Sequence, residues 1–238
     1  MRRFLRNNGL SIILLAFFLV CLAGQGVTGL REYNQDQEQH GQPRVTLAEY
    51  LGTGHFVESV FENWESEFLQ MAAFVVFTIG LRQKGSPDSK KLSGKEEVDE
   101  DPREKRDDPA APWPVRRGGF ILKVYEHSLT IALTLLFVTS FALHAVGGAR
   151  EYNQEQLEHG AETVTALAYI GTARFWFESF QNWQSEFLSV GVLVLLQIVL
   201  RQRGSPESKP VAAPHSQTGQ SGGDEGDDAP KKRKRKAA

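Results

Sequence analysis

The sequence predicts an all-α membrane protein with four transmembrane helices, arranged as two parallel two-helix repeats. Three observations lead to this fold class: four long apolar segments, an internal duplication, and an uneven distribution of Lys and Arg between the segments that join them. The formal net charge of -2 and the mean hydropathy of -0.32 are typical of a soluble protein. These averages combine apolar segments with a charged linker and tail, so they do not decide the class.

The duplication covers most of the chain. Residues 31–90 align with residues 150–209 without a gap, and 31 of the 60 aligned positions are identical. The most informative motif, Asn63-Trp-Glu-Ser-Glu-Phe68, returns as Asn182-Trp-Gln-Ser-Glu-Phe187. A repeat of this length is too large for a solenoid unit and indicates a duplicated module.

The repeat defines four regions of the chain. We predict a first module at 1–90, a charged linker at 91–119, a second module at 120–209 and a tail at 210–238. The linker and the tail contain few large apolar residues and many charged or small ones, so both are predicted to be disordered.

Each module opens with a membrane segment, at about 9–30 and about 125–149. Their uncharged stretches of about 20 residues are long enough, at about 1.5 Å per residue, to cross a hydrocarbon core of about 30 Å. Arg2, Arg3 and Arg6 also fit a signal peptide. The matching segment of the second module is internal, which favours a membrane helix at both places.

The second segment of each module, at 56–81 or 175–200, has a shorter uncharged stretch that aromatic residues extend upstream. Trp is favoured at the membrane interface, and Arg is favoured on the cytoplasmic side. We therefore predict interface anchors at four positions: Trp64, Trp183, Arg82 and Arg201.

The cations predict the orientation. With both termini in the cytoplasm, 23 Lys and Arg lie on the cytoplasmic side and four on the other side. Two helices per module insert both copies in the same direction. The modules are then related by a pseudo-two-fold axis along the membrane normal, as in parallel-repeat transporters.

Polar residues near the outer ends of the helices are the candidate functional groups. A carboxylate at the edge of the hydrocarbon core is costly unless it faces the bundle interior or water, which makes Glu67 and Glu186 the leading candidates for a cation or proton site. Alternatively, both end the buried stretch in the headgroup region. The polar residues predicted to accompany them are Asn63, Asn182, Ser66, Ser185, Gln25 and His144. Interhelical hydrogen bonding is the alternative role for Gln25 and His144.

Two histidines, His40 and His159, lie beside acidic residues at equivalent positions. They are candidates to bracket a divalent metal, but no local ligand spacing supports this, and the alternative is a capped loop in which Gly41 and Gly160 each end a short helix. We therefore predict no metal site, no cofactor and no catalytic residue. The single Cys excludes a disulfide within the chain.

The chain ends in a basic cluster that predicts contact with anionic lipid and no specific nucleic acid. Its members are Lys231, Lys232, Arg233, Lys234, Arg235 and Lys236. A homo-oligomer or an envelope protein is the expected protein partner.

The repeated motifs resemble an uncharacterised bacterial family of small integral membrane proteins. They run in the order Tyr-Asn, His-Gly, Asn-Trp-x-Ser-Glu-Phe-Leu and Leu-Arg-Gln-x-Gly-Ser in both modules. The first copy carries the full signature Asn-Trp-Glu-Ser-Glu-Phe-Leu-Gln70, and the second copy departs from it at Gln184 and Ser189. The resemblance implies a location in the bacterial inner membrane and no activity.

The expected function is a non-enzymatic structural or interaction component of the envelope. The alternative is a small cation- or proton-handling transporter or channel that uses the paired carboxylates. An enzyme acting on lipid or quinone has no supporting motif.

Overall fold

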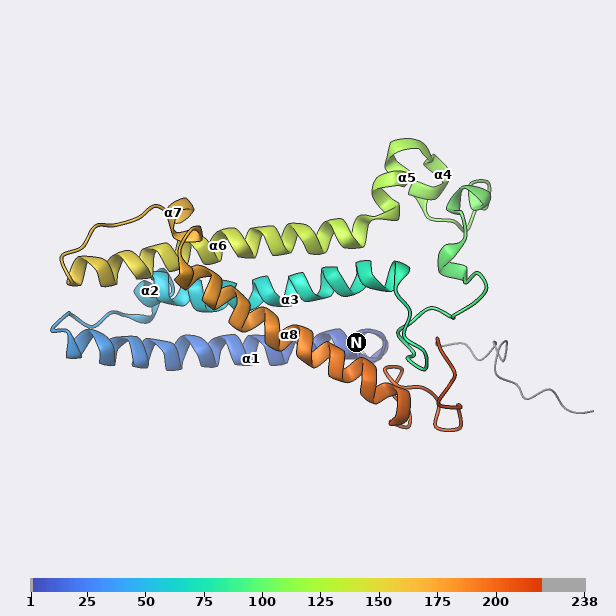
Figure 1. Ribbon diagram of the computed structural model, residues 1–238, viewed down its shortest axis with the longest axis horizontal. Helices are drawn as coiled ribbons and strands as arrows, with labels where there is room; N and C mark the ends of the chain where they lie inside the picture. Colours follow the sequence, from blue (N-terminus) through green and yellow to red (C-terminus); the bar gives the residue numbers. More distant parts are fainter. Residues whose placement is uncertain (1, 220–238) are drawn as a thin grey trace, which may run out of the picture. The chain divides into compact units, whose positions relative to one another are not determined.

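The computed structural model describes residues 2–219, and these residues form helices and turns with no strand among them (Figure 1). The predicted all-helical class is thus confirmed for this part of the chain. The basic cluster predicted to contact lipid, residues 231–236, lies outside the described residues.

Among residues 2–219, three helices are long and apolar enough to cross a membrane: α1 (Arg2–Gln39), α6 (Ser128–Glu158) and α8 (Ala173–Val199). The prediction of four such helices is wrong in number. Helix α3 (Gly54–Gly80) forms where a membrane segment was predicted, but it does not meet this standard. Four acidic residues in its first half, Glu58, Glu62, Glu65 and Glu67, dilute its apolar character.

The long helices extend beyond the predicted segments. Residues 31–39 and 150–158 were predicted to lie in external loops, but they continue α1 and α6 as helix. Gly41 and Gly160 follow the helix ends with φ of 69° and 68°, a left-handed conformation that glycine adopts without strain. Their role in ending a helix is as predicted, although the helix is long and not a separate short one.

Two short helices, α2 (Leu47–Tyr50) and α7 (Ala166–Ile170), lead into α3 and α8. Thr46 caps the first: its side chain accepts a hydrogen bond from the backbone N–H of Glu49. Thr165 caps the second in the same way, through the N–H of Ala168. Equivalent threonines thus begin equivalent helices in the two copies.

The connection between α3 and α6 contains short helices where a disordered linker was predicted. These are η1 (Glu97–Asp99), η2 (Pro102–Lys105), α4 (Trp113–Arg117) and α5 (Gly119–Glu126). Proline in the first turn of η2 and α4 favours such starts. Helix α5 ends at Glu126, and His127 follows it with φ of -116°. Helix α6 therefore begins at Ser128, three residues after the predicted start of the membrane segment at about 125.

The chain divides into two compact units. The first unit contains the described residues up to Glu65 together with Val138–Phe180, and the second contains Ser66–Phe137 together with the described residues from Gln181. Within the first unit, Ala145, Ala149, Tyr169 and Phe175 form a buried apolar cluster.

Candidate functional site

The first unit buries a group of charged side chains. Glu58 and Glu65 come from α3, His144 from α6 and Glu178 from α8. His144 and Glu65 have no exposed surface, Glu58 is 8% exposed and Glu178 is partly buried. We call these four residues the buried cluster. Burying a charge costs free energy unless it is paired, so such a group requires an explanation.

The imidazole of His144 lies between two carboxylates. Its Nδ1 is 2.8 Å from Oε2 of Glu65, and its Nε2 is 3.4 Å from Oε2 of Glu178. Phe175 stacks on the ring with centroids 4.7 Å apart and an interplanar angle of 24°. Because Phe175 is completely buried, it shields one face of the imidazole from solvent.

Glycines in α6 let α3 and α7 approach His144 closely. A Cβ atom built at Gly147 would lie 2.5 Å from the backbone nitrogen of Glu58. A Cβ atom at Gly148 would lie 2.9 Å from Oε1 of Glu58 and 2.5 Å from Cε1 of Tyr169. Such close approach of helices is the usual role of small residues in membrane bundles.

Tyr169 and Arg174 hold two of the carboxylates in place. The Tyr169 hydroxyl lies 2.7 Å from Oε2 of Glu178 and 3.3 Å from Oε1 of Glu58, so its proton is shared between them. The Arg174 Nε donates to Oε1 of Glu178 at 2.9 Å. Burial and the hydrogen bond to Glu178 raise the pKa of the Tyr169 phenol, so the phenol stays neutral and acts as a donor.

The cluster holds more negative than positive charge. Three carboxylates, those of Glu58, Glu65 and Glu178, meet one permanent cation, Arg174, which also forms an ion pair with Glu155. A proton on His144 adds a second cation. The arrangement can therefore store and exchange protons or another cation.

Of the predicted site residues, His144 is in the cluster and Gln25 is at the equivalent place of the first copy. Gln25 Nε2 donates to the Ser59 hydroxyl at 3.3 Å. This bond between uncharged side chains stands at the positions equivalent to those of His144 and Glu178, which contact each other in the second copy. Asn63 donates to the backbone carbonyl of Ser59 at 2.8 Å.

The leading candidates Glu67 and Glu186 both belong to the second unit, outside the buried cluster. Glu67 is exposed and Glu186 is half-buried. Ser66 is buried, whereas Ser185 is exposed and donates to the carbonyl of Asn182 at 2.8 Å.

The predicted anchors have local roles. Trp64 packs edge-on against Phe61 at 5.1 Å, and Trp183 against Phe137 at 6.4 Å. Arg82 donates to the carbonyl of Ile79 at the end of α3. Arg201 donates to the carbonyl of Gln197 at the end of α8. Cations at these positions also favour the helix dipole.

His40 and His159 do not belong to the group of described residues whose spacing suits a metal ion. Each imidazole lies beside the backbone carbonyl four residues earlier, at 3.0 Å from Asp36 O and 2.8 Å from Glu155 O. The group of described residues with metal-ligand spacing is Glu58, His144 and Glu178.

Four residues of the site were missed from the sequence: Glu58, Tyr169, Arg174 and Glu178. Glu65 was not among the candidates either, since its equivalent in the second copy is Gln184 and the leading candidates, Glu67 and Glu186, are carboxylates in both copies. The sequence signal that marks the buried cluster is a difference between the two copies, and not an identity. Glu178 replaces Ser59, and His144 replaces Gln25, so ionisable residues mark the places where the copies differ.

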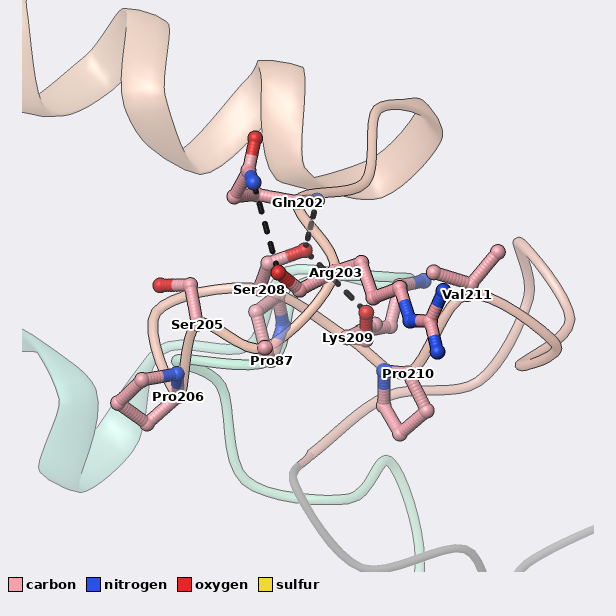
Figure 2. Close-up of a pocket in the computed structure, with 10 residues that line it drawn as sticks. Pro87, Gln202, Arg203, Ser205, Pro206, Ser208, Lys209, Pro210 and Val211 are labelled. Carbon is pink, nitrogen blue, oxygen red and sulfur yellow. Dashed lines mark hydrogen bonds between the residues drawn. The ribbon is translucent and has the colours of Figure 1, made fainter.

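The second unit contains a separate cavity of about 330 Å³ beside the Gly-Ser-Pro turn that follows α8 (Figure 2). Pro87, Arg203 and Pro206 line it, and the backbone N–H of Gln202 donates to the Ser208 hydroxyl at 2.9 Å. The matching turn after α3 has the same bond, from Gln83 to Ser89 at 2.9 Å. This repeated bond stabilises the turn and indicates no ligand.

The helices and the buried cluster define the class: over its described residues the chain is an all-helical protein with three helices long and apolar enough to cross a membrane and a charged network among its helices. The chain belongs to the family described as Domain of unknown function (DUF6766), whose model matches residues 1–220. No curated protein and no solved structure matches the chain.

Proposed function

We propose that the protein is an inner-membrane protein of bacteria that handles protons or other cations at the buried cluster. The observation that carries this proposal is the position of His144, whose two ring nitrogens face the carboxylates of Glu65 and Glu178. A structural or interaction component of the envelope was the leading expectation. Such a component gains little stability from burying three carboxylates, whereas ion-handling proteins require ionisable groups in these places.

Protonation changes the chemistry of the cluster. An imidazolium donates from both nitrogens and bridges the two carboxylates. When it releases the proton facing Glu178, a lone pair of Nε2 faces a carboxylate oxygen, and this repulsion favours uptake of a cation. Besides Glu65 and Glu178, Glu62 of α3 acts electrostatically on His144. Around them, Tyr169 of α7 and Arg174 of α8 act on Glu178, Glu178 of α8 and Glu151 of α6 act on Glu58, and Glu155 of α6 acts on Arg174.

The predicted membrane placement completes the proposal. The two repeats insert in parallel, with a pseudo-two-fold axis along the membrane normal, and both termini face the cytoplasm. Both termini on one side require an even number of crossings, so this placement includes α3 as a fourth crossing, although α3 does not reach the apolar character of the other three long helices over a membrane-crossing stretch. The basic tail contacts anionic lipid, and a homo-oligomer or an envelope protein is the partner.

A flux assay tests the function. Purified protein is reconstituted in liposomes that contain a pH-sensitive dye, and proton uptake is measured under an imposed potential. His144→Gln and Glu178→Ser copy the residues of the first module, Gln25 and Ser59, and each is expected to abolish the uptake. His159→Gln changes an exposed histidine outside the cluster and serves as the control. Absence of uptake by wild type, or equal uptake by all variants, refutes the ion-handling function and favours a structural or interaction role.

A labelling experiment tests the placement. In a Cys21→Ser background, single cysteines at Gln39 and at Lys95 are treated with a membrane-impermeant thiol reagent on intact cells. We expect labelling at Gln39 alone. Labelling at both positions, or at Lys95 alone, contradicts the proposed orientation.

A further inference from the structure

We propose that the buried cluster binds one divalent transition-metal ion, with His144 Nε2 and the carboxylates of Glu58 and Glu178 as its ligands. This inference rests on the proposed function and names the class of cation that the site takes. One ligand atom from each of the three residues lies within 4.8 Å of the others. Ligand distances of about 2.0–2.2 Å place two ligand atoms at most about 4.4 Å apart, so a small closure of the carboxylates completes the site.

Glu65 gives His144 the tautomer that a metal ligand needs. Its Oε2 lies 2.8 Å from Nδ1, so when the imidazole is neutral its proton stays on Nδ1 and the lone pair of Nε2 is directed toward Glu178. A carboxylate behind a histidine is the usual support of a metal-bound imidazole, because it fixes the ring and increases its basicity. Glu65 has no exposed surface, so water does not compete for this bond.

Tyr169 and Arg174 position the second ligand. Arg174 binds Oε1 of Glu178, which leaves Oε2 directed toward His144 and the Tyr169 hydroxyl. The same hydroxyl reaches Oε1 of Glu58, so it holds the two carboxylates next to each other. Carboxylates held at this spacing repel each other, and a cation between them removes the repulsion.

The formal charges agree with a divalent ion. The carboxylates of Glu58, Glu65 and Glu178 carry three formal negative charges, and the guanidinium of Arg174 is shared between Glu178 and Glu155. A proton on His144 offsets one of the negative charges, and a divalent cation offsets two. The proton and the metal therefore occupy the same place, between Nε2 and Glu178, and exclude each other.

The ligand chemistry selects the ion. Imidazole nitrogen combined with carboxylate oxygen suits Zn²⁺, Mn²⁺, Fe²⁺ or Co²⁺, whereas Mg²⁺ and Ca²⁺ prefer oxygen ligands alone. The duplication predicts the stoichiometry. His144 and Glu178 of the second module correspond to Gln25 and Ser59 of the first, and Glu58 of the first module corresponds to Phe177 of the second. None of these three counterparts is an equally good metal ligand, so the described chain forms one such site and not two.

Cobalt binding to the purified full-length protein in detergent tests the inference. Co²⁺ reports its coordination by visible absorption, and equilibrium dialysis gives the stoichiometry. We expect one Co²⁺ per chain, displaced by Zn²⁺ and not by Mg²⁺. His144→Gln and Glu178→Ser are each expected to weaken binding by more than about 100-fold. Glu65→Gln, which keeps an acceptor for Nδ1 but removes its charge, weakens it by about 10- to 100-fold.

The control variant is His159→Gln, which is expected to bind Co²⁺ like wild type. No Co²⁺ or Zn²⁺ binding by wild type, or equal binding by His144→Gln, overturns the inference. If the cluster variants fail to fold, pulsed electron paramagnetic resonance of wild type loaded with Mn²⁺ still decides: coupling to an imidazole nitrogen supports the site, and oxygen ligands alone refute it.

The outcomes separate this inference from the proposed function. Proton uptake that depends on His144 without metal binding leaves the proposed function standing and refutes the metal site. One bound metal without any flux gives the reverse result, a metal site in a protein that does not transport.

Discussion

Gly147→Ala tests whether the close approach of α6 and α3 within the first unit creates the buried cluster. The added Cβ would lie 2.5 Å from the backbone nitrogen of Glu58 and 3.0 Å from its Cα. Carbon atoms pack at about 3.5–4.0 Å, so the two helices must separate by roughly 1 Å. Because the overlapping atoms are backbone, no side-chain rotation relieves the contact.

The cost can be estimated from two opposing effects. Overpacking of this kind costs about 1–3 kcal/mol, while replacing glycine by alanine inside a helix contributes about 0.5–1 kcal/mol. We expect a net loss of about 1–2 kcal/mol in the free energy of unfolding. The separation also moves Glu58 away from Tyr169, so the ion-handling activity decreases with the stability.

Unfolding of the purified protein in mixed micelles of detergent and dodecyl sulfate, followed by helical circular dichroism, measures this loss. Gly24→Ala is the matched control, because nothing lies within 4 Å of its added Cβ, and a gain of about 0.5–1 kcal/mol is expected there. If Gly147→Ala were as stable as Gly24→Ala, the close approach of the helices would be refuted.

Three further predictions concern hydrogen bonds and pH. Tyr169→Phe removes the hydroxyl that donates to both Glu58 and Glu178 and is expected to cost about 1–3 kcal/mol, more than Tyr50→Phe, whose hydroxyl meets His55 at 3.1 Å. Equal losses from Tyr169→Phe and Tyr50→Phe in the same unfolding assay contradict this. Asn34→Ala and Asn153→Ala are expected to cost similar amounts, about 1–2 kcal/mol of unfolding free energy. Each side chain makes two hydrogen bonds to one backbone residue, Asn34 to Val45 at 3.0 and 2.7 Å and Asn153 to Val164 at 2.8 and 2.7 Å. A difference above about 1 kcal/mol between the two variants refutes their equivalence. Burial raises the pKa of Tyr50 to about 12 and also raises that of Tyr169, whereas an unfolded tyrosine ionises near 10. The stability that the two neutral phenols contribute is complete below about pH 10 and is lost as the pH rises toward 12 and beyond. Unfolding free energies measured from about pH 10 to 12 are therefore expected to decrease less steeply in the variant with both Tyr50→Phe and Tyr169→Phe than in wild type.

The local features of the fold are predictable from the sequence because their causes lie within a few residues. Thr46 and Thr165 begin helices through their own side chains, and Gly41 and Gly160 end helices because glycine adopts positive φ. The all-helical class and the apolar helices follow from composition in the same way. The extension of α1 and α6 was missed because polar residues continue a helix wherever one of its faces is covered.

The number of membrane helices could not be predicted from composition. The first half of α3 is acidic, and composition cannot tell a carboxylate that faces lipid from one that faces another helix. The structure shows that Glu58 and Glu65 are buried inside the first unit. Their cost is offset by partners on α6 and α7 that are far away in the sequence.

The sequence by itself determined the duplication, the helical class and the presence of His144 in an apolar segment. Only the tertiary structure decided which charges meet. Repetition pointed to Glu67 and Glu186, and the second unit places these two carboxylates close enough to interact electrostatically. The buried cluster joins Glu58 and Glu65 of one copy to His144 and Glu178 of the other, at positions that are not equivalent. Contacts of this kind depend on how helices pack against each other, and neither periodicity nor repetition encodes that directly.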